Sequence, residues 1–205
     1  MSAEWDEYKK VADERFSEHK AHLLMSNDRF TAIDWRRPGS SDYFVSYIVD
    51  RKLGSLIIHG DLGDCIASWN HAVTVADMKN YVKDVPYFMK KFQCSSDKLV
   101  FETDTVLDCV INNLFDDDEE IYEHFTDHEE YLRFREDLCS DIEDSIKNNG
   151  EDFFPTEHLV ELVSDLLGGD DYAAYGVLDE PGAMISPRVY LWAIGFVMAC
   201  DKLGL

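Results

Sequence analysis

Residues 58–64 read Ile-His-Gly-Asp-Leu-Gly-Asp and bring one imidazole and two carboxylates close together in the chain. A carboxylate beside a substrate hydroxyl can act as a general base. His59, Asp61, Asp64 and His71 together also offer ligands for a metal-dependent phosphohydrolase or phosphotransferase. The same residues fit a turn between two strands, in which glycine supplies a positive φ and aspartate bonds the backbone. We favour the turn, and the small metal-dependent enzyme is the alternative.

The segment is similar to the H-G-D-L segment of aminoglycoside-type phosphotransferases, where the Asp acts on the substrate hydroxyl. That family has an Asn five residues after the Asp, where this chain has Ile66, and its later metal-binding Asp has no downstream counterpart here. An Ile-Asp-Trp at residues 33–35 lies upstream, which is the wrong order. With residues 70–71 the segment also resembles calcineurin-like metallophosphatases, but the opening D-x-H motif is missing. These departures weigh against catalysis.

His124 and His128 are four residues apart, so on one helix they would share a face and chelate a divalent metal, for which zinc is the candidate. Glu123 and Asp127 could add oxygen ligands. Phe125 stands where the zinc proteases with an H-E-x-x-H motif have Glu, which excludes that class. The alternative is two solvated histidines whose proton affinity is raised by acidic neighbours. No cofactor is firmly indicated, and zinc at this pair of histidines is the candidate.

Acidic residues outnumber basic ones by 42 to 19, which gives a net charge of −23. Residues 1–100 are nearly balanced, with 14 basic and 15 acidic side chains, whereas residues 101–205 have 5 and 27. Such a surface repels nucleic acid and membranes and attracts basic grooves on proteins. We therefore expect a basic protein partner and no direct contact with nucleic acid or membrane.

The excess is densest in residues 116–144, which contain 14 carboxylates and two arginines. Carboxylates three or four residues apart on a helix lie roughly 5–6 Å apart, which is comparable to phosphate spacing along a strand. A groove built for nucleic acid would accept such a line of charge. The alternative is a solvated acidic face without a partner. The predicted partner-binding residues are Asp116, Asp117, Asp118, Glu119, Glu120, Glu123, Asp127, Glu129 and Glu130.

Hydrophobic periodicity predicts how the chain positions these groups. We expect a helix over 3–20, then strands over 22–25, 30–35, 43–49, 55–59 and 65–69 as an antiparallel meander. Helices should follow over 74–82, 87–92, 105–115, 128–147 and 156–166, with a short strand over 99–101 and a last helix between Pro187 and Gly204. This order predicts an α+β fold. Residues 1–103 would form the helix and sheet, and the acidic helices of 104–205 would pack on that sheet as one domain.

Three features of the sequence bear on the cellular compartment of the protein. The N-terminus has no signal-peptide pattern, no apolar run reaches the length of a membrane span, and the five cysteines are odd in number and widely spaced. This favours free thiols in a reducing cytoplasm.

Four stretches resemble a small family of uncharacterised proteins from phages and mobile elements of Gram-positive bacteria. They are Ile-Asp-Trp at 33–35, Tyr-Ile-Val-Asp at 47–50, Gly-Ser-Leu-Ile-Ile-His-Gly-Asp-Leu-Gly-Asp at 54–64, and Trp69. The likeness covers about residues 10–100. Acidic proteins of this size in that setting are often anti-CRISPR proteins, including inhibitors of Cas9. The resemblance thus implies an inhibitor, without catalytic activity, that binds a Cas9-type nuclease in the host cytoplasm and blocks its engagement of DNA or guide RNA.

Overall fold

A computed structural model describes residues 3–96, 98–115, 124–149 and 152–205. The chain divides into two compact units, and each has its own hydrophobic core. The first, called the sheet unit below, consists of residues 1–98 and 185–205. The second, called the acidic unit, consists of residues 99–184. The acidic unit is therefore inserted into the sequence of the sheet unit.

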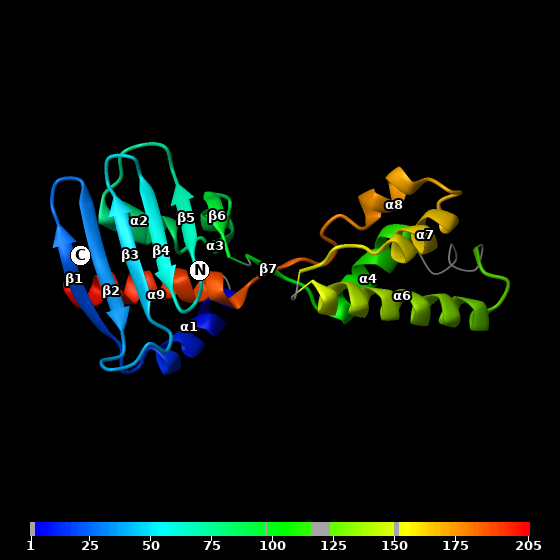
Figure 1. Cartoon of the computed structure of the whole chain (residues 1–205), viewed down its shortest axis with the longest axis horizontal. Helices are drawn as coiled ribbons and strands as arrows, with labels where there is room; N and C mark the ends of the chain where they lie inside the picture. The colour runs from blue at the N-terminus through cyan, green and yellow to red at the C-terminus, as the bar shows by residue number, and fades with distance from the viewer. Residues whose placement is uncertain (1–2, 97, 116–123, 150–151) are drawn as a thin grey trace. The chain divides into compact units, whose positions relative to one another are not determined.

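The sheet unit contains a six-stranded antiparallel sheet whose strands lie in chain order (Figure 1). Its strands are β1 (Lys20–Ser26), β2 (Phe30–Arg36), β3 (Val45–Asp50), β4 (Ser55–Gly60), β5 (Cys65–Ser68) and β6 (Phe92–Ser95). Alternation decides which face is buried: Val45, Tyr47 and Val49 of β3 are fully buried, whereas Ile48 between them is exposed. The predicted meander is confirmed, and the fold is α+β.

Helices cover one face of this sheet and share its core. They are α1 (Ala3–Arg15), α2 (Val75–Tyr81), α3 (Val85–Met89) and α9 (Pro187–Leu203). The predicted start of α2 is confirmed, because Thr74 and Asp77 form a reciprocal capping box. The predicted end of α9 is also confirmed, because Gly204 adopts the left-handed conformation with φ 69°.

One buried hydrogen bond ties the sheet to α9. The Tyr47 hydroxyl donates to the backbone carbonyl of Trp192 at 3.0 Å, and both side chains are fully buried. Burial raises the pKa of Tyr47 well above its usual value, so the hydroxyl stays protonated. The centre of the sheet is thereby held at a fixed distance from the helix.

The acidic unit is helical. Its helices are α4 (Thr103–Leu114), α6 (His128–Asn148), α7 (Glu157–Leu166) and α8 (Asp171–Val177). Leu107, Leu138, Ile142 and Leu159 lie at the centre of its core. Two short paired strands, β7 (Leu99–Val100) and β8 (Met184–Ile185), lie where the chain passes between the units. None of the helices in the described part of the chain is long and apolar enough to cross a membrane.

The structure differs from the predicted division of the chain at residues 103 and 104. The first unit ends at Lys98, and the chain returns to it at Ile185. Helix α9 belongs to the sheet unit because it contributes nine buried residues to that core. The packing of the acidic helices on the sheet stays a prediction.

Candidate functional site

The segment around Asp61 forms the turn between β4 and β5. The Asp61 side chain accepts a hydrogen bond from the backbone N–H of Tyr43 at 2.8 Å, and its own N–H donates to the carbonyl of Phe44 at 3.0 Å. A Cβ on Gly60 would lie 2.2 Å from that same carbonyl oxygen, so only glycine fits there. Gly63 has φ 93°, a conformation that favours glycine. Asp61 and Gly60 thus hold the turn against the residues just before β3, and Gly63 closes the turn through its N–H, which donates to the carbonyl of Gly60.

The four residues of the enzyme alternative are only partly brought together. Nδ1 of His59 lies 2.5 Å from the Asp64 carboxylate, and these side chains are 71% and 66% exposed. The Asp61 carboxylate accepts the hydrogen bond from the backbone N–H of Tyr43, and Nδ1 of His71 lies 2.7 Å from the carbonyl oxygen of Trp69. Within the described ranges, no three His, Cys, Asp or Glu side chains are arranged to hold a metal ion. The segment therefore presents a solvated His–Asp pair at a turn.

The predicted helical face shared by His124 and His128 is wrong. Residues 125–127 are not helical, and Asp127 is the N-cap of α6, so His128 begins a new helix. The Asp127 carboxylate accepts a hydrogen bond from the backbone N–H of Glu130 at 2.9 Å, which fixes this break. Each imidazole lies against a different ring, His124 near Phe115 and His128 near Tyr131.

Residues 116–120 and Glu123, six of the predicted partner-binding positions, lie outside the described residues. The other three, Asp127, Glu129 and Glu130, are exposed at the start of α6. Two of them also stabilise that helix end. Besides the Asp127 cap, the Glu130 carboxylate accepts hydrogen bonds from the backbone and hydroxyl of Thr126, and these bonds hold the pKa of Glu130 below its usual value.

Helix α6 carries more exposed acids than the sequence prediction named. Leu138 and Ile142 face the core, and two sets of acids lie on the remaining surface of the helix. The members of the first set, here the acid row, are three, four or seven residues apart, so they lie along one side of the helix. The acid row contains no basic residue. It consists of Glu130, Asp137, Asp141 and Asp144.

The second set on α6, here the mixed row, contains both acidic and basic residues: Glu129, Arg133, Glu136, Glu143 and Lys147. In it, the Lys147 ammonium lies 2.5 Å from the Glu143 carboxylate. In the acid row, Asp141 pairs with His158 of α7. The hydrogen bond to Asp141 and its charge raise the pKa of His158. The acid row could have been found from sequence by marking positions three, four and seven residues apart.

Charge is divided between the units more sharply than between the halves of the sequence. Residues 99–184 contain 26 acidic and 3 basic side chains, whereas the rest of the chain contains 16 of each. The net charge is therefore −23 on the acidic unit and zero on the sheet unit. In the described part of the acidic unit no carboxylate is buried, so these charges face water. No protein-family model, curated protein or solved structure matches this chain.

Proposed function

We propose that this chain inhibits a basic, nucleic-acid-binding defence protein of a host cell, a Cas9-type nuclease. It binds that protein in the cytoplasm and occupies the surface that DNA or guide RNA would use. Inhibition is stoichiometric and requires no catalysis. The observation that carries the proposal is the confinement of the whole net charge of −23 to the acidic unit, beside a neutral sheet unit.

The acid row places part of this charge in a line along α6. The acid row runs from Glu130 to Asp144, so at 1.5 Å per residue it spans about 21 Å. That length corresponds to about six nucleotides at 3.4 Å per phosphate of one strand. A groove with lysines and arginines spaced for a phosphate backbone would meet carboxylates along the same span and release bound counterions. The acids of residues 116–123 would extend the field.

A nuclease assay tests the proposal. A purified Cas9-type nuclease is mixed with the full chain before or after guide RNA and target DNA, and cleavage is followed. The expected result is complete inhibition near one equivalent when the chain is added first, and weaker inhibition when nucleic acid already occupies the groove. Undiminished cleavage at tenfold excess, in either order of addition, would refute the proposal for this target.

Two charge-matched variants separate a specific surface from net charge alone. Asp137→Asn with Asp144→Asn removes two charges from the acid row. Glu136→Gln with Glu143→Gln removes two from the mixed row of the same helix. Both variants have the same net charge, so long-range attraction is equal in both. We expect the first to weaken binding more than the second. Equal weakening would mean that the partner senses net charge only, and no effect of either would refute a role for α6.

A further inference from the structure

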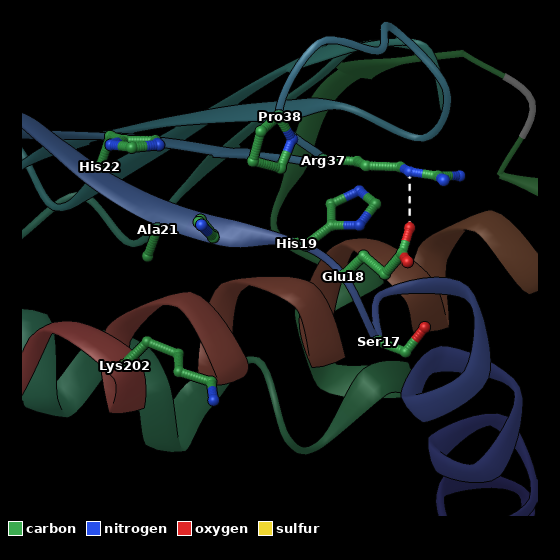
Figure 2. Close-up of a pocket in the computed structure, with 9 residues that line it drawn as sticks. Ser17, Glu18, His19, Ala21, His22, Arg37, Pro38 and Lys202 are labelled. Carbon is green, nitrogen blue, oxygen red and sulfur yellow. Dashed lines mark ion pairs between the residues drawn. The ribbon is translucent and has the colours of Figure 1, made fainter.

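A cleft of about 840 Å³ opens in the sheet unit, and all of its lining residues belong to that unit (Figure 2). The turn after α1, the first residues of β1, the loop after β2 and the last turn of α9 surround it. Lys20 and His22 come from β1, Arg37 from the loop and Lys202 from α9. Its volume lies within the roughly 300–1,000 Å³ that is typical of sites for small molecules.

Positive charge gathers in this cleft, although the sheet unit as a whole is neutral. Lys20, Arg37 and Lys202 line it, and the only acidic lining residue is Glu18. The Glu18 carboxylate lies 2.6 Å from Nε of Arg37, which leaves the terminal guanidinium nitrogens for another acceptor. Lys20 and Lys202 form no ion pair with any residue in the described ranges. The cleft therefore offers two ammonium groups and the end of a guanidinium to an anion.

The back of the cleft is a packed and neutral wall. His19 is 7% exposed, and its ring lies 4.9 Å from the ring of Phe16 and 5.4 Å from that of Trp35. Nε2 of His19 lies 3.1 Å from the carbonyl oxygen of Tyr43, so this nitrogen carries the hydrogen and donates it. Burial lowers the pKa of His19, and the charge of Arg37 lowers it further. The wall is thus fixed in shape and adds no charge, which leaves recognition of an anion to the long cationic side chains at the mouth.

We propose that this cleft binds a phosphate-bearing small molecule of about nucleotide size. A phosphate group provides up to two negative charges and several acceptor oxygens, which matches two ammonium groups and a guanidinium better than a single carboxylate would. The volume leaves room for a larger body against Ala21 and Pro38, which also line the cleft. Nothing in this proposal depends on the nuclease target.

Titration of the isotope-labelled full chain with pyrophosphate, and separately with ATP, tests the site by NMR. Both are added without divalent metal at about 0.15 M salt, where the Debye length of roughly 8 Å weakens the influence of the charges on the acidic unit. We expect saturable shifts of the backbone amides of residues 17–22 and 37, with ATP binding more tightly than pyrophosphate. Equal affinities for ATP and pyrophosphate would mean that the cleft recognises phosphate groups alone, which would overturn the proposal that its ligand has the size of a nucleotide. Absence of saturable shifts from both ligands would overturn the site.

A double variant and a matched control identify the residues. Lys20→Ala with Lys202→Ala should lower the affinity for pyrophosphate roughly tenfold or more, because two of the three cations that line the cleft are lost. Lys10→Ala with Lys52→Ala removes two exposed lysines outside the cleft lining and should leave it unchanged. Amide spectra that keep their dispersion show that both variants fold. A similar loss in both variants would mean general charge attraction and would overturn the proposal.

Discussion

The crossing of α9 over Tyr47 makes Gly195 sensitive to a single added methyl group. A Cβ on Gly195 would lie 2.6 Å from the Tyr47 hydroxyl oxygen and 3.2 Å from Cε2 of Phe16. Tyr47 is fully buried and donates to the Trp192 carbonyl, so the ring cannot withdraw without breaking that bond. Gly195→Ala must therefore shift the helix or the ring.

Two opposing terms set the size of the effect. Overpacking a core costs about 1–3 kcal/mol, and alanine is favoured over glycine inside a helix by about 1 kcal/mol. We expect Gly195→Ala to lower the free energy of unfolding by about 0–2 kcal/mol. Tyr47→Phe alone should cost about 1 kcal/mol for the lost hydrogen bond. It also removes the atom at 2.6 Å, so adding Gly195→Ala to that variant should cost nothing and should stabilise it by up to about 1 kcal/mol.

Urea unfolding followed by tryptophan fluorescence measures this coupling directly. The tryptophans are Trp5, Trp35, Trp69 and Trp192, and all belong to the sheet unit, so the signal reports that unit alone. The double-mutant cycle should give an interaction energy of about 1 kcal/mol or more, as for residues in contact. If Gly195→Ala costs the same in both backgrounds within about 0.3 kcal/mol, the overlap with Tyr47 is not what excludes a side chain at this position.

Three other perturbations have defined outcomes. Asp61→Asn retains an oxygen that accepts from Tyr43, so stability and target inhibition should stay nearly unchanged; loss of inhibition by a folded variant would favour the enzyme alternative. Because the pKa of His158 is raised by Asp141, its stabilising contribution is complete below about pH 6.5 and disappears as pH rises through the raised pKa. Amide exchange of α7 should therefore be slower in the unmodified chain than in His158→Gln at pH 6, and the difference should shrink by pH 8. Association with the target should slow roughly tenfold or more between low and moderate salt, with dissociation little changed. Replacing the five acids of residues 116–120 with Asn and Gln should slow association similarly. A rate that is indifferent to salt and to those substitutions would contradict steering by the acids at Asp116, Asp117, Asp118, Glu119 and Glu120.

Local sequence signals predicted the elements that depend on neighbouring residues. The alternation in β3, the capping box before α2 and Pro187 in the first turn of α9 each act within a few residues, and each is present in the structure, although the Ser186 side chain forms no cap hydrogen bond. The helix predicted over 87–92 instead ends at Met89, and Phe92 begins β6. Its pairing with Ala67 across the sheet outweighs the local helical preference. Long-range pairing of this kind is not visible in a local pattern.

The acid row and the cleft also differ in whether a local sequence pattern can reveal them. The acid row repeats along one helix, so its spacing can be found in the sequence. The cleft combines residues 18–22 with Arg37 and Lys202, which only the antiparallel pairing of β1 with β2 and the packing of α9 bring together. The single helical face predicted for His124 and His128 is wrong for a third reason: Asp127 caps a new helix between the two histidines.

Burial divides the carboxylates of this chain into two kinds with opposite consequences. Asp50 is 5% exposed and accepts two hydrogen bonds from the guanidinium of Arg29, which lower its pKa. Its replacement by Asn should weaken the sheet unit, because a charge-assisted pair is lost at a buried site. Asp137 and Asp144 are exposed on α6, away from its buried face, so their replacement leaves the core intact. Binding that weakens with unchanged stability is therefore expected only from carboxylates of the second kind, and in the described part of the acidic unit no carboxylate is buried.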